Sequence, residues 1–491
     1  MKQLIFSFTI IILLVTQLNS QSLVNFDNYF TDQTMRIDYF HIGDAIEEFI
    51  TIDQVYQYGT WAGSRVNLLD NFNNGRYYVN IFDAESRELI FSKGFDSYFG
   101  EYKTSEDAID RIKRTYHETV LIPFPKSMII FSIEKRDRNN HRFQIFTEHI
   151  DPSDVSIIRD EIKDRTVAVY EADKNGDPHS RVDIAILGEG YTLDDKRKFE
   201  EDLKYFTNVF FSQPPYSFYE DKFNIYGVYK PSEDSGVDEP RANIYKNTVM
   251  NCTFNSLGSE RYLLTEDNKT VRDLAAHVPY DALYIMVNHS RYGGGGIYNL
   301  YCTFTTGNQY KDYLFVHEFG HSFSGLADEY YTSSTAYNDF YPKGVEPVEP
   351  NITALTGPLN LKWDKLLTPG IEIPTPWEKA DYDSMDLKWQ SERTGMNDKI
   401  AELKRNKSHF IEIEKAEKEY AQKDREHSEL VDSYLKGSRY HGQVGVFEGA
   451  GYSSKGLYRP MLDCIMFSKG DKPFCTVCNG AIVKVINHYS E

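Results

Sequence analysis

The sequence predicts a multidomain fold, in which an N-terminal antiparallel β-sandwich is followed by an α/β (α+β) domain with a helical insertion. Short β-like runs separated by turn residues fill the first 155 residues, and alternating strand and helix patterns begin near residue 178. A highly charged helical stretch interrupts this second part at 381–437. The chain of 491 residues is roughly three times as long as a typical domain, so more than one core is expected.

The first 20 residues have the pattern of a secretory signal peptide. A basic start, MKQ, precedes an apolar stretch over 4–15 and the segment TQLNS. The apolar stretch is too short to span a bilayer comfortably, so we expect no stable membrane insertion. Cleavage after Ser20 would leave a mature chain that begins near Gln21 and is secreted, periplasmic or held at the cell surface.

Residues 21–155 are expected to form the β-sandwich as an accessory domain. The clearest strand patterns lie at 77–82, 89–91, 128–133 and 143–146. We find no clustered metal ligands and no nucleophile in this part of the sequence. Its predicted role is therefore not catalytic.

Residues 178–491 are expected to form the catalytic domain. Strands are predicted at 182–187, 223–229 and 283–287, and apolar residues at helical spacing predict a helix over 199–210. Within this domain the insertion at 381–437 contains no Gly or Pro from Met396 to Lys436, and its heptad pattern is broken by charged residues. We expect a solvated helical hairpin with little burial, and a partner-binding arm is the alternative.

The segment 314–330 carries the chemistry. His317 and His321 are four residues apart, so a helix places both imidazoles on one face, where they can bind one Zn²⁺. Glu318 between them is predicted to be the general base that takes a proton from a metal-activated water. Burying two histidines and a glutamate without a partner would be costly, which argues against a plain core helix.

A catalytic zinc ion usually has three protein ligands, so a third is required. The metzincin pattern H-E-x-x-H-x-x-G-x-x-H has a glycine turn followed, three residues later, by the third ligand. Here Gly325 is followed by Asp328 at that step, although Gly325 lies one residue further from the second histidine. Asp328 is the predicted third ligand, and Glu329 is the alternative.

Two further segments fit such a site. Gly293, Gly294, Gly295 and Gly296 could form a rim that an extended peptide approaches closely, or simply a flexible loop. Met466 in a Cys-Ile-Met run resembles the Met-turn, a hydrophobic floor beneath a metzincin zinc site.

The five cysteines form at most two disulfides and leave one thiol. The pair Cys475 and Cys478 could be a redox pair, half of a zinc site or partners of distant cysteines, and we assign it no catalytic role.

Together these segments resemble the bacterial IgA-peptidase family of secreted, metzincin-like zinc metallopeptidases. The resemblance lies in HEFGHSFSGLADEYY, in the preceding RVDIAILGEGYT and YGGGGIYN, and in the following LKWDKLLTPGIEIPTPW, VFEGAGY and YRPMLDCIM. It implies a zinc endopeptidase with an N-terminal β domain, with His317, His321 and Asp328 as zinc ligands. It does not imply that immunoglobulin is the substrate of this chain.

The expected function is therefore a secreted, zinc-dependent endopeptidase (a hydrolase) that uses one catalytic Zn²⁺ and acts on a protein or peptide substrate. A net charge of −20, from 54 Lys and Arg against 74 Asp and Glu, argues against a nucleic-acid partner. No oligomeric state follows from the sequence. The alternatives are a catalytically idle, zinc-stabilised extracellular binding protein and a zinc amidase that acts on non-peptide bonds. An intact Glu318 favours an enzyme over the idle protein.

Overall fold

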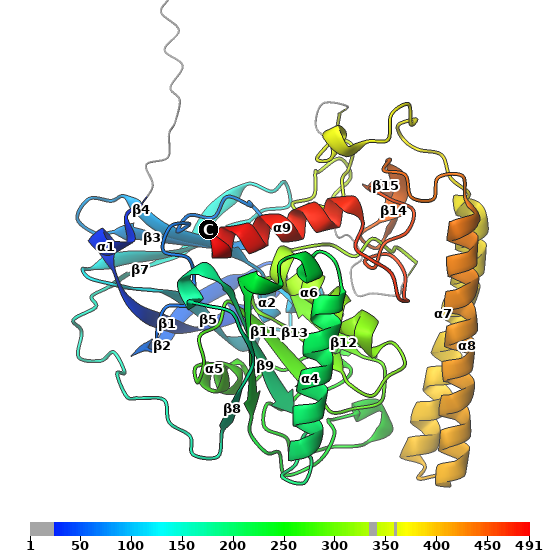
Figure 1. Cartoon of the computed structure of the whole chain (residues 1–491), viewed down its shortest axis with the longest axis horizontal. Coiled ribbons are helices and arrows are strands. Elements are labelled where there is room, and N and C mark those ends of the chain that lie inside the picture. The colour runs from blue at the N-terminus through cyan, green and yellow to red at the C-terminus, as the bar shows by residue number, and fades with distance from the viewer. Residues whose placement is uncertain (1–23, 333–340, 358–360) are drawn as a thin grey trace, which may run out of the picture.

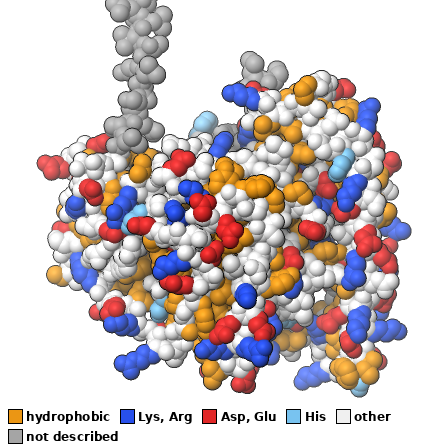
Figure 2. Space-filling view, viewed as in Figure 1, with side chains coloured by type: hydrophobic (Ala, Val, Ile, Leu, Met, Phe, Trp, Pro, Cys, Tyr) orange, Lys and Arg blue, Asp and Glu red, His pale blue; other side chains and the backbone are white. Residues whose placement is uncertain are grey.

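The computed structural model describes residues 24–332, 341–357 and 361–491 (Figure 1). The predicted signal peptide lies outside these residues. In the part of the chain that is described, no helix has the length and apolar character needed to cross a bilayer. Acidic and basic side chains are interspersed over the face of the molecule drawn in Figure 2.

The N-terminal part contains two antiparallel sheets that pack face to face. One has the order β2-β1-β5 and the other β4-β3-β6-β7. Their strands are β1 (Phe30–Gly43), β2 (Glu48–Tyr58), β3 (Tyr77–Asp83), β4 (Leu89–Phe95), β5 (Arg114–Pro125), β6 (Ile129–Arg136) and β7 (Arg142–Ile150). Alternate residues of facing strands, such as Ile37 and Ile81, form a common core. The prediction of antiparallel β structure is confirmed, although β1, β2 and β5 had no predicted counterpart.

The second part is built on a six-stranded mixed sheet with the order β12-β13-β11-β9-β10-β8. Its strands are β8 (Ala168–Lys174), β9 (Val182–Glu189), β10 (Phe223–Tyr229), β11 (Ala282–Val287), β12 (Gly294–Ile297) and β13 (Tyr301–Thr305). The four inner strands are parallel, and β8 and β12 are antiparallel at the two edges. Because β8 pairs with β10, the sheet begins ten residues before the expected domain boundary at 178.

Helices cover both faces of this sheet (Figure 1). On one face lie α4 (Lys196–Ser212), α6 (Lys311–Ser324) and α9 (Thr476–Ser490), which share an aromatic core with the sheet. On the other face, α5 (Asn268–Ala275) contacts both β9 and β5. The core on this second face also includes residues of the short helices α2 (Tyr98–Tyr102) and α3 (Glu106–Ile109). The N-terminal and C-terminal parts therefore share a continuous core.

Helices α7 (Lys379–Arg405) and α8 (Phe410–Gly437) form the predicted hairpin, seen at the right of Figure 1. Most of the hairpin is exposed or half-buried, as expected, but its inner face is buried at a few positions. Val431 and Leu435 are buried in the core that contains α6, because these are the apolar positions on the inner face of α8. Near the far end, Lys404 forms a 3.2 Å ion pair with Glu239 of the second part. The remaining elements are α1 (Phe26–Tyr29) and the hairpin of β14 (Phe447–Ala450) and β15 (Ser453–Arg459).

Candidate active site

Helix α6 places the HExxH motif between the sheet and an open cleft. Phe315 and Phe319 stack on Tyr284 of β11, with ring centroids 4.6 and 4.8 Å apart. This aromatic contact fixes which face of α6 is turned to the core. The face that carries His317 and His321 lies along the cleft.

The structure brings the side chains of His317, His321 and Asp328 together. The Nε2 atoms of the two histidines lie 3.1 Å apart. The Oδ1 atom of Asp328 lies 3.1 Å from Nε2 of His317 and 3.3 Å from Nε2 of His321. Four donors placed tetrahedrally around zinc, at the usual zinc–nitrogen and zinc–oxygen distances, would be separated by about 3.3 to 3.6 Å. The donor types and their spacing therefore fit a zinc ion.

Backbone carbonyls orient both imidazoles. Nδ1 of His317 lies 2.9 Å from the carbonyl oxygen of Ile465, and Nδ1 of His321 lies 2.6 Å from that of Leu326. A carbonyl oxygen can only accept a hydrogen bond, so each ring donates its Nδ1–H. The Nε2 lone pairs are then directed at the point where the three side chains meet, as metal ligation requires.

A tight turn at the end of α6 brings Asp328 back to the histidines. Gly325 adopts a left-handed conformation with φ of +62°, which glycine accepts without steric cost. The N–H of Gly325 donates to the carbonyl of His321 and that of Leu326 to the carbonyl of Gly320, which is the Schellman pattern. The chain then reverses and places the Asp328 carboxylate beside the imidazoles.

Asp328 and Glu329 point to different places. The hydroxyl of Tyr452 donates a hydrogen bond to Oδ2 of Asp328, and Oδ1 faces the histidines. Glu329 is fully buried, and its Oε1 lies 3.3 Å from Sγ of Cys478. Of the two alternatives for a third ligand, the structure brings Asp328 and not Glu329 to the histidine pair.

Attraction between opposite charges holds the side chains of Asp328 and the two histidines together without a metal ion. Burial lowers the pKa of His321, but the Asp328 carboxylate outweighs it and raises that pKa to about 9. Burial also opposes ionisation of Asp328, yet His321 and His317 hold its pKa well below the usual range. The carboxylate is thus ionised, which is the form that binds a metal, and a metal ion at this point would displace the proton from Nε2 of His321.

Glu318 is half-buried and lines the same cleft as the histidines. Burial raises the pKa of its carboxyl above the ordinary value, although His317 and His321 oppose this. A Cβ atom added at Gly294 would lie 3.1 Å from Oε1 of Glu318. Strand β12 therefore passes directly over the glutamate.

The cleft has a volume of about 670 Å³ and lies between the two parts of the chain. Its floor is formed by α6 and the Asp328 turn, and one wall is formed by β12. The N-terminal part also lines the cleft with charged side chains of both signs, among them Lys103, Lys135 and Arg136 and the acidic Glu101. The region predicted to be accessory thus contributes directly to the shape and charge of the cleft.

The glycine segment is an ordered strand and not a flexible loop. Gly294, Gly295 and Gly296 line the cleft in β12, whereas Gly293 is not among the lining residues. A Cβ atom at Gly296 would lie only 2.3 Å from the carbonyl oxygen of Glu318. Glycine is required here because the strand packs against the backbone of α6.

Met466 is fully buried against α6 and does not line the cleft. A Cβ atom at Gly320 would lie 3.0 Å from its sulfur, so the side chain packs on the helix between the two histidine turns. Its carbonyl accepts a hydrogen bond of 2.8 Å from the N–H of Glu329. The role of Met466 as a Met-turn stays a prediction.

Several groups at the site were missed by sequence reasoning. Tyr313 stacks on His317 and its hydroxyl lies 3.2 Å from Nδ1 of that ring. Its spacing of four residues before His317 was the available signal. Tyr452 lies within the VFEGAGY segment but nothing in its spacing indicated contact with Asp328. The carbonyl of Ile465 is a backbone group, so no residue type in the sequence could indicate its contact with His317.

Comparison with known families agrees with this geometry. The sequence model of the family described as IgA Peptidase M64 matches residues 170–486, and that described as Peptidase M64 N-terminus matches residues 25–147. No curated protein matches the chain. The larger match covers more than half of the chain and contains every residue of the HExxH site. The chain therefore belongs to the IgA Peptidase M64 family of peptidases.

Proposed function

We propose that this protein is a secreted zinc endopeptidase of metzincin-like architecture, with His317, His321 and Asp328 as the zinc ligands. The observation that carries the proposal is the convergence of two Nε2 atoms and one carboxylate oxygen at 3.1 to 3.3 Å from one another, on the floor of the cleft. Three protein ligands and an open side are typical of a catalytic zinc site, whereas a structural site is closed by four.

The bound zinc would supply Lewis acidity, which polarises the scissile carbonyl and lowers the pKa of a water molecule. Glu318 would take the proton from the attacking water at a carboxylate oxygen and deliver it to the leaving nitrogen. Tyr452 holds the Asp328 carboxylate, and the carbonyls of Ile465 and Leu326 hold the imidazoles. These contacts would keep the ligands in place during turnover.

The position of β12 supports a polypeptide substrate. It is the last strand of the sheet and lies along the cleft beside Glu318, so its free edge could pair with an extended chain. The backbone of this edge is already engaged at Gly294, whose carbonyl accepts a hydrogen bond of 3.3 Å from Leu263. The carbonyl of Ile297 is engaged as well, by a 3.0 Å hydrogen bond from the N–H of Leu300, so we assign substrate pairing to Gly295 and Gly296.

The test is the zinc content of the mature chain, measured together with its cleavage of a peptide library and of unfolded proteins. We expect about one zinc ion bound at the histidines and cleavage of peptides at internal bonds. His321→Ala should lose this zinc ion and the cleavage activity. His141→Ala, which changes an exposed histidine, is the matched control. A zinc content of His321→Ala equal to that of the wild type would contradict the ligand assignment.

The same assay separates the alternatives. Zinc bound at the histidines without cleavage of any substrate would favour the binding protein. Cleavage of amide bonds in glycan substrates, with peptides left intact, would favour the amidase.

A further inference from the structure

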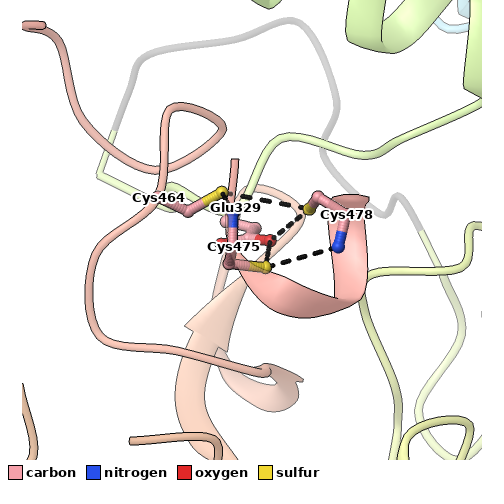
Figure 3. A group of neighbouring side chains, drawn as sticks. All are labelled: Glu329, Cys464, Cys475 and Cys478. Carbon is pink, nitrogen blue, oxygen red and sulfur yellow. Dashed lines mark hydrogen bonds between the residues drawn. The ribbon is translucent and has the colours of Figure 1, made fainter. Parts of the chain in front are cut away.

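A second cluster of metal-ligating side chains lies behind the Asp328 turn. It consists of Glu329, Cys464, Cys475 and Cys478, whose side chains converge in Figure 3. Sγ of Cys478 lies 3.9 Å from Sγ of Cys464 and 3.3 Å from Oε1 of Glu329. Sγ of Cys475 lies 3.9 Å from the same Oε1. Each of the four donor atoms lies within 4.8 Å of the other three.

These distances match a closed tetrahedral site. Four donors around zinc, at its usual distances to sulfur and oxygen, would be separated by about 3.8 Å between sulfurs and about 3.6 Å between sulfur and oxygen. The donors come from three separated segments: the turn after α6, the loop at 464–466 and the beginning of α9. Their convergence is therefore a product of the tertiary fold and not of one local turn.

Backbone N–H groups are directed at the sulfurs, whereas burial raises the pKa of the Cys464 and Cys478 thiols above the ordinary value. Three backbone N–H groups donate to the sulfurs: Cys475 N–H to Cys464 at 3.2 Å, Met466 N–H to Cys464 at 3.5 Å, and Cys478 N–H to Cys475 at 3.4 Å. Cys475 is also the N-cap of α9, a helix of 15 residues whose N-terminus attracts negative charge. Such hydrogen bonds stabilise a thiolate, which is the metal-binding form of cysteine.

A buried carboxylate needs a partner of opposite charge. Glu329 is 0% exposed, and in the described part of the chain its Oε2 has no hydrogen-bond partner. Burial raises the pKa of Glu329 well above its ordinary value, and the charge of the buried Arg459 opposes this, but the hydrogen bonds of that guanidinium go to backbone carbonyls such as that of Gly449. One guanidinium would leave an ionised carboxylate and three thiolates with a net charge of −3, and a divalent cation would reduce this to −1.

A disulfide explains the cluster less well. None of the cysteines is disulfide-bonded in the structure. A bond between any two of these three would leave the third thiol and the Glu329 carboxylate buried together. The convergence of three sulfurs and one oxygen, each aimed at the same point, is what a metal requires.

We propose that Cys464, Cys475, Cys478 and Glu329 bind a structural zinc ion, separate from the ion at the histidines. With four protein ligands the site has no open position for a substrate, so its role is to hold the fold together. Glu329 follows Asp328, and Cys464 precedes Ile465, whose carbonyl orients His317. The ion would therefore fasten both loops that shape the active site to the N-terminus of α9.

The first test uses the intact mature chain. Metal analysis should find two zinc ions per chain, one from each cluster. X-ray absorption at the zinc edge should detect sulfur neighbours at about 2.3 Å, since the histidine site contains no sulfur ligand. After cobalt replaces zinc, a thiolate-to-cobalt charge-transfer band should appear in the near-ultraviolet.

Two sets of variants assign each ion to its cluster. Cys478→Ala should lose one zinc ion and the thiolate band, and Cys302→Ala, which changes a buried cysteine of β13, should keep both. His317→Ala should lose one zinc ion but retain the sulfur-bound one. Each variant removes only one of the two ions, so the assignment of the histidine site and the proposal of the cysteine site can fail independently of each other.

Two results would overturn the proposal. One is intact protein without sulfur neighbours around its zinc, which remains decisive even where Cys478→Ala does not fold. The other is a thiol titration of the chain, unfolded with chelator and without reductant, that finds three free thiols and a disulfide within the cluster. Titration of all five thiols, with zinc released on unfolding, would support it.

Discussion

Replacing Glu318 by glutamine tests the catalytic mechanism most directly. The change exchanges one carboxylate oxygen for an amide nitrogen and leaves the size and shape of the side chain nearly unchanged. Glu318 is half-buried and approached closely by β12 at Gly294, so a larger substitution would disturb that contact. The isosteric variant removes the proton acceptor alone. We expect it to fold normally and to bind zinc as the wild type does.

The expected loss is confined to the chemical step. General-base help contributes about 10² to 10⁴ in rate, which corresponds to about 2.7 to 5.5 kcal/mol of transition-state stabilisation. The assay is kcat and KM for a peptide substrate found in the library screen, with zinc content measured on the same sample. We expect kcat to fall by that factor while KM and bound zinc change little. Near-normal turnover would refute the assignment of Glu318 as the base, and loss of zinc would show that it contributes to binding the metal.

Three further predictions follow from named contacts. Asp328→Asn should lower the affinity for the zinc at the histidines more than Glu329→Gln does, because only Asp328 contacts both imidazoles. A chelator competition that follows only the zinc ion without sulfur neighbours, and that gives the opposite ranking, would overturn the assignment of Asp328 as the third ligand. Leu435→Ala should lower the free energy of unfolding by about 2 to 5 kcal/mol, because this side chain is 1% exposed. The control Leu430→Ala, on the outer face of the hairpin, should change it by less than about 0.5 kcal/mol. Equal effects of the two changes in chemical denaturation would show that the hairpin does not pack as described. Burial and repulsion by Asp281 raise the pKa of Asp183 to about 8. The folded protein therefore keeps a proton on this carboxyl that the unfolded chain releases near pH 4. The stability of the wild type should fall as the pH rises from about 4 to about 8. Asp183→Asn should therefore raise the melting temperature at pH 8 and have a smaller effect at pH 5, and a difference independent of pH would contradict this reasoning.

Local sequence determined the core of the candidate site. A four-residue spacing on a helix necessarily brings His317 and His321 onto one face, and a glycine after the helix permits the reversal that returns Asp328. Strand patterns at 77–82 and 223–229 were recognisable because alternating or wholly apolar runs reflect burial directly. These features depend on neighbours within a few residues, so they can be predicted from the sequence alone.

The sequence-based interpretation of the hairpin was incomplete for a physical reason. Its charged composition indicated a solvated surface, and most of its outer face is exposed. The few apolar residues on the inner face, such as Val431 and Leu435, suffice to bury one side against the core. A broken heptad excludes a regular coiled coil, but it does not exclude packing against a different partner surface.

The sequence by itself predicted the type of chemistry, because the spacing of the histidines and the intervening glutamate are local. Only the tertiary structure placed Asp328, and not Glu329, beside the histidines, because the two residues are adjacent in sequence but point to different clusters. It alone joined Cys478 to Glu329 across 149 residues and the carbonyl of Ile465 to His317 across 148 residues. Contacts between such distant segments arise when the sheet, α6 and α9 pack together, and they leave no periodic trace in the sequence.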